Sequence, residues 1–410
     1  MISRKIDTLG LVKLALLACV FTCGVSIYLG GSKVYAVIVL CSLCIVLLPD
    51  RNARTINYLC LGVFVVAFLS VVINFREIES VFRPVDRILM LLVVMLAFAP
   101  MVNSKSLFLF RKKVFLYFSI GLSLMALASA ILALGGFGYD KDKLFGLSEW
   151  PNSLGFALGI AIIVMMVSLV NAKWKVRCIL VLLIGLCVYT IPKTGSRTSV
   201  YSLPVIFFLY TFFISNSVKS WIKSLLIMSA VTACFLAVVK IDLSIIEQKN
   251  ELARQRGENS REFLFATRMK EFSTSPIIGI GTFRCLTKYQ KVNESGNVEA
   301  GSSFLMFLSM NGLLGFTVFM CFYVGTIFTF AKYIIKKRKN GLSPLEQYIC
   351  LVLVFNFTYM LQAGAVLNPG FYITGFNWLS LSMAYMYPRY RMNKSEENQY
   401  FHDLPSGFNN

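Results

Sequence analysis

Residues 240–303 read KIDLSIIEQKNELARQRGENSREFLFATRMKEFSTSPIIGIGTFRCLTKYQKVNESGNVEAGSS and form the longest polar stretch of the chain. On both sides of this stretch, apolar runs long enough to cross a bilayer alternate with short, mostly basic segments. Such an alternation is typical of a helical protein that passes through a membrane many times. The sequence therefore predicts a bundle of membrane helices that carries one large loop.

The composition of the 410 residues agrees with this fold class. Hydrophobic residues make up 57% and charged residues 15%, against about 25% charged residues in soluble domains. The formal net charge of +20 is spread over the segments between the apolar runs. This distribution favours a role in membrane orientation and argues against a nucleic-acid partner.

Twelve candidate spans define the predicted fold class, an all-α polytopic membrane protein. Their ranges are 10–29, 33–49, 57–74, 88–103, 114–136, 151–171, 178–192, 198–215, 221–239, 303–331, 347–366 and 370–387. The predicted organisation is nine spans in residues 1–239, the large loop with short amphipathic helices in 240–302, three spans in 303–388 and a disordered cytoplasmic tail in 389–410. In the run 303–331, Asn311-Gly312 predicts an interfacial segment ahead of the membrane span.

The basic segments predict the orientation. If the N-terminus is cytoplasmic, the cytoplasmic side carries 22 basic and 6 acidic residues and the opposite side 18 basic and 14 acidic residues. The cytoplasmic connectors include residues 106–113, 171–177 and 332–341. Because positive charge is enriched on the cytoplasmic side, we expect both termini inside and the large loop outside.

The cysteines predict no structural disulfide. Ten of the eleven lie in or at the ends of apolar runs, and only Cys285 lies in the large loop. A single cysteine outside the membrane has no partner there.

Two arginines on the outward side are candidates for chemistry. Arg197 lies in TGSRTS, between two apolar runs, where Gly195 and Ser196 would let backbone N–H groups approach the same anion as the guanidinium. The alternative is an arginine at a helix end that reaches back to the interface. Arg268 lies in FATRMKEF ahead of a Pro/Gly turn, which predicts a short amphipathic helix along the membrane surface.

The order of these motifs resembles the O-antigen ligase and Wzy-type polysaccharide polymerase superfamily. The residues that carry the resemblance are Ser196-Arg197-Thr198, Arg268 followed by Gly279 and Gly281, Gly312 with Gly315, and the Trp150-Pro151-Asn152 helix start. The resemblance covers about residues 145–320. It implies a GT-C-like membrane glycosyltransferase of the bacterial inner membrane, with the large loop in the periplasm.

The resemblance also implies the substrate, a glycan on undecaprenyl diphosphate, and a reaction without a metal or another cofactor. Arg197 and Arg268 would hold the diphosphate as charge develops on it. Further substrate-binding candidates on the outward side are Arg83, Arg284, Trp150 and Tyr289. A chain-length regulator and a flippase are candidate partners, beside membrane lipid. The nearest acidic pair, Asp140 and Asp142, is interpreted as a solvated loop.

One departure from the pattern favours a polymerase over a ligase. The ligase branch would have a histidine just ahead of the late helix, but the single histidine here is His402, in the predicted cytoplasmic tail. Glu299 stands at the corresponding place and is the candidate general base for a sugar hydroxyl. A surface loop acid is the alternative. A ligase and, from another class, a flippase or transporter of lipid-linked oligosaccharide stay open as functions.

Overall fold

The computed structural model describes residues 54–140, 143–148, 150–215, 219–226, 260–289, 301–338, 341–364, 366–368 and 371–390, together with the single positions 39, 42, 43, 46 and 251. The α-helices of the described part are α3 Tyr58–Ile73, α4 Pro84–Phe98, α5 Lys105–Leu134, α6 Pro151–Leu169, α7 Trp174–Thr190, α8 Arg197–Ile214, α11 Ser260–Thr274, α12 Ser303–Arg338, α13 Pro344–Met360 and α14 Tyr372–Met386. Short 3-10 helices are η1 Phe75–Glu77, η2 Ser80–Phe82 and η3 Pro192–Thr194. Two antiparallel pairs join β1 Thr55–Ile56 to β2 Val102–Asn103 and β3 Tyr139–Asp140 to β4 Lys143–Leu144.

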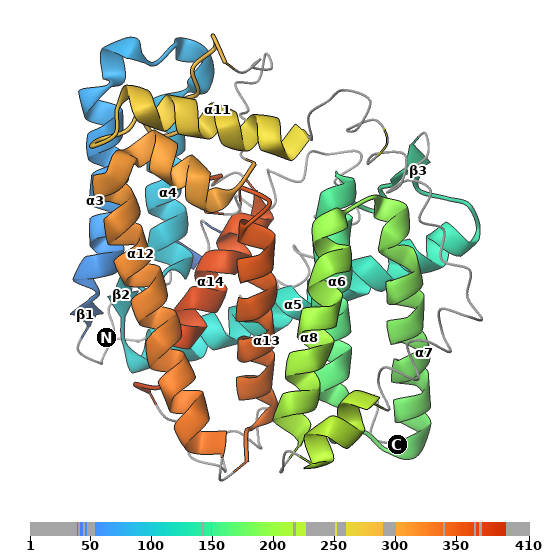
Figure 1. Ribbon diagram of the computed structural model, residues 1–410. Coiled ribbons are helices and arrows are strands. Elements are labelled where there is room, and N and C mark those ends of the chain that lie inside the picture. The colour runs from blue at the N-terminus through green and yellow to red at the C-terminus, as the bar shows by residue number, and fades with distance from the viewer. Residues whose placement is uncertain are drawn as a thin grey trace, which may run out of the picture.

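The helices form two groups joined by α5 and α13 (Figure 1). One group contains α3, α4, α12 and α14, and the other contains α6, α7 and α8. Helix α13 packs against α6, α8 and α14, and α5 packs against α6, α7 and α14. Helix α11 lies across the top of α12, and α5 crosses the bundle behind the upright helices (Figure 1).

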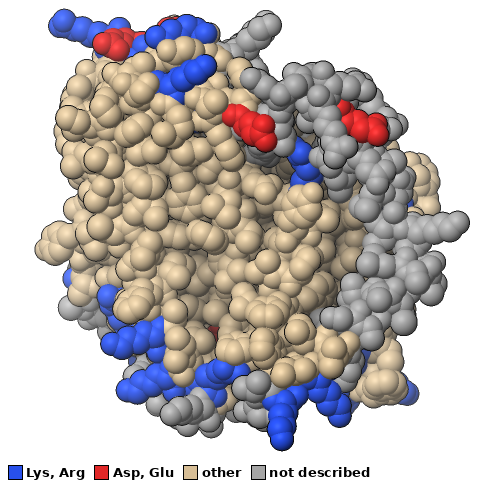
Figure 2. All heavy atoms as spheres, viewed as in Figure 1, with Lys and Arg blue, Asp and Glu red and all other residues tan. Residues whose placement is uncertain are grey.

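The surface of the bundle fits a membrane. Five described helices are long and apolar enough to cross one, namely α5, α6, α7 with η3, α8 and α12. Figure 2 shows a broad band without charged side chains between an upper and a lower end that carry them. Helix α7 exposes large apolar side chains, such as Leu182 at 73%. In water such exposure would be costly, whereas in lipid it is the ordinary state.

The predicted spans agree in part with these helices. Spans 57–74, 151–171, 198–215 and 370–387 coincide with α3, α6, α8 and α14 to within two residues at each end. Spans 10–29, 33–49 and 221–239 lie wholly or mostly outside the described residues. The total of twelve membrane spans therefore stays a prediction.

The basic segment 106–113, predicted as a connector, belongs instead to α5. Arg111 is fully buried, and its guanidinium donates to the carbonyl oxygens of Leu96 and Ala97, both at 3.0 Å, and of Val102 at 2.9 Å. The last carbonyls of a helix have no partner within the helix, and Arg111 supplies donors for those of α4. The connector prediction was wrong here. A pattern of charged residues does not distinguish an arginine in water from an arginine that caps the C-terminus of a neighbouring helix.

The long helix α12 is interrupted at Gly312, within the run where an interfacial segment was predicted. Gly312 has φ 64° and ψ −170°, which breaks the helix into two pieces. The piece before Gly312 turns across the top of the bundle and the piece after it runs down to the lower end (Figure 1). This agrees with an entry segment ahead of a membrane span.

Candidate functional site

One end of the bundle gathers the motifs that the sequence singled out (Figure 1). It contains the first turns of α6, α8 and α12, the last turn of α13, and α11, which lies across the top of α12. We call it the loop end, because residues 260–289 of the large loop lie there. At its centre, Gly301 allows α12 to touch α11: a Cβ atom at Gly301 would lie 3.0 Å from the Cβ of Leu264.

Arg197 is the first residue of α8 and is half-buried. The turn before it depends on Gly195, whose φ of 63° is left-handed. Ser196 is buried against Gly155 of α6, where an added Cβ would lie 2.7 Å from the serine Cβ. The next residue, Thr198, donates its hydroxyl to Oε1 of Gln362 at 2.7 Å. The contacts of its two neighbours, Ser196 with Gly155 and Thr198 with Gln362, therefore hold the backbone of Arg197 at the loop end.

The backbone N–H groups of this turn are not available to an anion. Gly195 N–H donates to the carbonyl of Pro192 at 2.8 Å, and Ser196 N–H donates to the hydroxyl of Thr194 at 3.1 Å. The expectation that Gly195 and Ser196 would offer these groups to a ligand was wrong. The TGS sequence therefore builds the turn that leads into α8.

Arg268 lies on the buried face of α11 rather than along the membrane surface. Its side chain has 0% exposure, and its Nη1 atom lies 2.7 Å from Oε2 of Glu271, one turn later and also 0% exposed. The helix itself was predicted correctly, and its exposed face includes Met269 and Lys270. The buried face of α11 therefore carries an ion pair as well as apolar side chains.

Glu271 is the functional candidate that the sequence did not reveal. Its Oε1 atom accepts the backbone N–H of Leu286 at 2.8 Å, while Oε2 binds Arg268. One carboxylate therefore fastens α11 to the segment that follows it. The spacing of three residues from Arg268 is compatible with an ion pair on a helix, but only the fold shows that both groups are buried.

The motif glycines of PIIGIG and NGLLG interlock with each other. Four backbone hydrogen bonds join them. Leu313 N–H donates to Pro276 O at 2.8 Å and Leu314 N–H to Ile277 O at 3.1 Å. In the other direction, Ile280 N–H donates to Ser309 O and Gly281 N–H to Met310 O, both at 3.1 Å. We call this contact the loop–helix lock. It supplies partners for backbone groups that the break in α12 leaves without helical ones.

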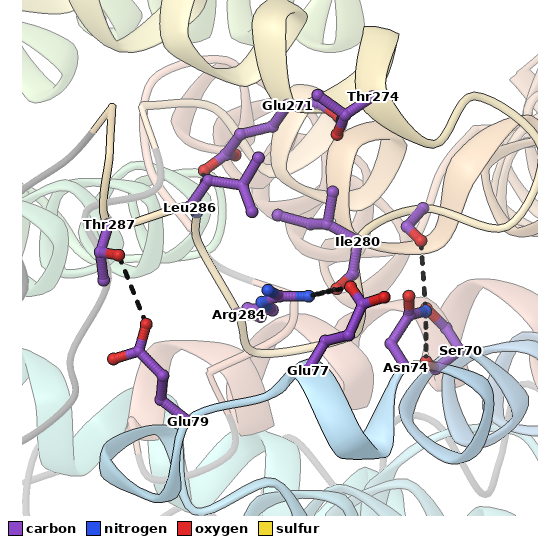
Figure 3. A network of polar contacts seen from close by, with 11 residues as sticks. Ser70, Asn74, Glu77, Glu79, Glu271, Thr274, Ile280, Arg284, Leu286 and Thr287 are labelled. Atoms are coloured by element: carbon purple, nitrogen blue, oxygen red, sulfur yellow. Dashed lines mark hydrogen bonds and ion pairs between the residues drawn. The ribbon is translucent and has the colours of Figure 1, made fainter.

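The lock is also tied to α3. The hydroxyl of Ser70 contacts the carbonyl oxygens of Ile278 at 3.1 Å and Met310 at 2.7 Å. The amide of Asn74 donates to Gly279 O at 3.2 Å (Figure 3). The loop after α11 therefore has a fixed position against α3 and α12.

The remaining candidates lie around this assembly. Arg284 pairs with Glu77 at 3.0 Å, and Thr287 donates to Glu79 at 3.3 Å (Figure 3). These two contacts connect the segment after α11 with the α3–α4 connection. Arg284 is therefore engaged by a protein carboxylate, with 13% of its side chain exposed.

Arg83, Trp150 and Tyr289 lie on other parts of the loop end. Arg83 is exposed and holds a left-handed backbone with φ 45°, an unusual state for a residue with a Cβ. Trp150 is 61% exposed ahead of α6, and the ring of Tyr289 lies 4.7 Å from Nζ of Lys288.

Glu299 and His402 lie outside the described residues, as does Asp142. Within the described part of the chain, no three His, Cys, Asp or Glu side chains gather closely enough to hold a metal ion.

Arg197 and Arg268 lie at the same end of the bundle but on different elements. The connection between them runs through three contacts: Thr198 with Gln362, the hydroxyl of Ser303 with the carbonyl of Ala363, and Gly301 with Leu264. The segment just after α13, with Gln362 and Ala363, thus connects the two arginine motifs.

The comparison with known families matches this part of the chain. No curated protein matches the sequence. Residues 182–320 match the family model Wzy_C, described as O-Antigen ligase, and this range contains Arg197, Arg268, Glu271 and the loop–helix lock. The match supports the assignment of this chain to the O-antigen ligase and Wzy-type superfamily, which the order of its motifs had predicted.

Proposed function

We propose that the protein polymerises lipid-linked glycan repeat units at the outer face of the bacterial inner membrane. The observation that carries the proposal is the place of the two arginine motifs, both at the loop end, within the range that matches the O-antigen ligase model. A membrane-embedded bundle with guanidinium groups at one end suits a substrate whose lipid lies in the bilayer and whose diphosphate lies at its surface.

The transfer forms one glycosidic bond and breaks one bond to phosphate. The hydroxyl oxygen of the acceptor repeat unit attacks the anomeric carbon of the growing glycan, the hydroxyl proton passes to a base, and undecaprenyl diphosphate leaves with the bonding electron pair. Negative charge grows on the leaving diphosphate. Positively charged donors held in place at that point stabilise the transition state.

Arg197 is the arginine that meets the diphosphate first in this proposal, because its side chain is only half-buried. Arg268 is proposed to bind the diphosphate as well, from the buried face of α11. A diphosphate reaches it only if Glu271 and the side chains that cover Arg268 move. Arg83, Arg284, Trp150 and Tyr289 surround the same end and are proposed to contact the diphosphate or the sugars.

Arg197→Ala is expected to abolish long glycan chains, because a point charge and its hydrogen bonds are lost together. Arg197→Lys keeps the charge but loses the planar pair of donors, so we expect at least a tenfold loss of polymer, about 1.4 kcal/mol. The measurement is the chain-length ladder on gels from cells that carry each variant alone, with protein levels matched. Lys270→Ala, an exposed residue of α11, is the control. Full activity of Arg197→Lys would contradict bidentate binding of the diphosphate by Arg197.

Glu299→Gln is expected to lower the transfer rate by about 10²–10⁴-fold, the usual contribution of a general base. The measurement is the rate of repeat-unit transfer by the purified protein in vesicles. A normal rate would remove Glu299 from the mechanism and leave the acceptor proton to another group.

A deletion strain separates the polymerase from its alternatives. Loss of a polymerase leaves single repeat units on the surface acceptor, and loss of a ligase leaves long polymer on undecaprenyl diphosphate. Loss of a flippase leaves single lipid-linked units on the cytoplasmic side. The absence of a histidine from residues 182–320 favours the first outcome.

A further inference from the structure

The end of the bundle opposite the loop end carries a concentration of positive charge that the glycan chemistry does not use. It is formed by the connection from α6 to α7, the end of α8 with residues 219–226, and the end of α12 with the turn to α13. Residues 164–180, 205–226 and 330–350 contain ten Lys and Arg residues and one acidic residue, Glu346. Figure 2 shows Lys and Arg gathered along this lower end.

These segments lie side by side. The hydroxyl of Tyr210 on α8 donates to Met166 O on α6 at 2.7 Å. The guanidinium of Arg338 at the end of α12 donates to the carbonyls of Phe212 and Ser215 at 3.2 and 3.3 Å and stacks on the Phe212 ring at 3.6 Å. The ends of α6, α8 and α12 therefore form one continuous surface.

Part of the charge serves the fold. Arg338 caps the C-terminal end of α8. Arg177 caps that of α6, because its guanidinium donates to the carbonyl oxygens of Leu169 and Val170 at 3.1 and 3.2 Å. Lys337 lies 2.6 Å from Glu346, which has 0% exposure. Thus the single carboxylate of the surface is buried and already paired.

Six lysines remain exposed on this surface and are named the lysine rim: Lys173, Lys175, Lys219, Lys223, Lys332 and Lys336. Two tryptophans lie among them. Trp174 is 75% exposed between Lys173 and Lys175, and Trp221 contacts the rings of Phe208 and Phe212 between Lys219 and Lys223. Tryptophan prefers the boundary between lipid and water, so the adjacent lysines are at headgroup level.

We infer that the lysine rim binds the headgroups of anionic phospholipids in the leaflet at this end of the protein. The rim supplies ammonium groups at the depth of the lipid phosphates, no exposed carboxylate on these segments competes with them, and α7 presents an apolar surface to the acyl chains. Zwitterionic lipids would gain less, because their own cation repels the lysines. The inference concerns the opposite end from the transfer reaction and does not depend on it.

The test compares lipid retention by the purified full-length protein. The protein is taken from bilayers with equal amounts of phosphatidylglycerol and phosphatidylcholine, and the retained lipids are counted by native mass spectrometry. We expect the wild type to retain phosphatidylglycerol preferentially. Lys173→Gln with Lys175→Gln, and Lys219→Gln with Lys223→Gln, should each weaken that preference by about fivefold for each lysine removed.

The matched control is Lys270→Gln with Lys288→Gln, two exposed lysines of the loop end, which removes the same charge elsewhere. An unchanged preference in the control together with a loss in the rim variants supports the inference. No preference in the wild type, an unchanged preference in both rim variants, or an equal loss in the control would overturn it. Thermal unfolding of each variant, expected within a few degrees of wild type, confirms that the fold is intact.

Discussion

Glu271→Ala is expected to destabilise the protein by about 3–5 kcal/mol, because it leaves the buried guanidinium of Arg268 without its carboxylate. It also removes the acceptor of the Leu286 N–H group. The loss should appear as a lower midpoint of thermal unfolding and as lower protein levels in the membrane. Glu77→Ala is the control, since it breaks an ion pair whose carboxylate is 70% exposed, and exposed pairs contribute about 0–1 kcal/mol.

Cys285 reports on the same region. Burial, with the Glu271 carboxylate as a second cause, raises the pKa of the Cys285 thiol to about 11. At pH 7 the thiol is therefore almost fully protonated, and a maleimide should label it slowly in the native protein. Glu271→Ala should speed the labelling as the segment from Gly281 to Tyr289 loosens, whereas Glu77→Ala should change it little. Slow labelling in Glu271→Ala would show that Glu271 does not fasten this segment.

A double variant separates stability from catalysis. Arg268→Met with Glu271→Gln removes both charges and keeps an oxygen acceptor for Leu286 N–H. Replacing both members of a buried pair avoids the cost of an isolated charge, so we expect most of the lost stability to return. If Arg268 stabilises the leaving diphosphate, this folded protein should still make no long glycan. If polymer returns together with stability, the role of Arg268 is to hold α11 in place.

Gly312→Ala is expected to have an effect of similar size. Gly312 has φ 64°, and an added Cβ would lie 2.3 Å from the carbonyl oxygen of Ile277. Gly279, on the other side of the lock, would clash in the same way: its φ is 82°, and an added Cβ would lie 2.3 Å from the backbone of Met310. Because backbone atoms cannot turn away as a flexible side chain can, the loop–helix lock must open. We expect each variant to lose about 3 kcal/mol or more and to make no long polymer.

The control for these variants lies in the same helix. Gly325 is in α12, and nothing lies within 4 Å of a Cβ atom added there. Gly325→Ala should keep or slightly raise the stability, since alanine favours a helix. Protease resistance of the segment from Pro276 to Gly281 would measure the lock directly. Equal resistance in Gly312→Ala and Gly325→Ala would contradict the role given to Gly312.

The membrane class, several spans and the short helix that carries Arg268 could be predicted from the sequence. Long apolar runs and a Pro/Gly turn are local signals, and they predicted α6, α8 and α11. Asn311-Gly312 predicted an interfacial segment ahead of the span in α12. The burial of Arg268 could not be predicted in this way. Its partner Glu271 and the Leu286 N–H group are brought together by tertiary packing, which one sequence does not reveal.

Arg111 and Gly195 show the same limit from the opposite direction. The sequence pattern placed Arg111 in a connector because it lies in a basic cluster, but the open carbonyls at the end of α4 bind it. Gly195 suggested an open turn for an anion, but the carbonyl of Pro192 already accepts its N–H group. In both cases the competing partner is a backbone group, and backbone groups leave no trace in the residue pattern.

The loop–helix lock also sets an order for biogenesis. The segment from Pro276 to Gly281 leaves the ribosome before Ser309 to Leu314, so the four backbone hydrogen bonds of the lock form only after the later helix has been made. Synthesis and docking are thus coupled: a nascent chain that stops before residue 303 has the contacts of this segment with Ser70 and Asn74 available but lacks the partners that α12 supplies.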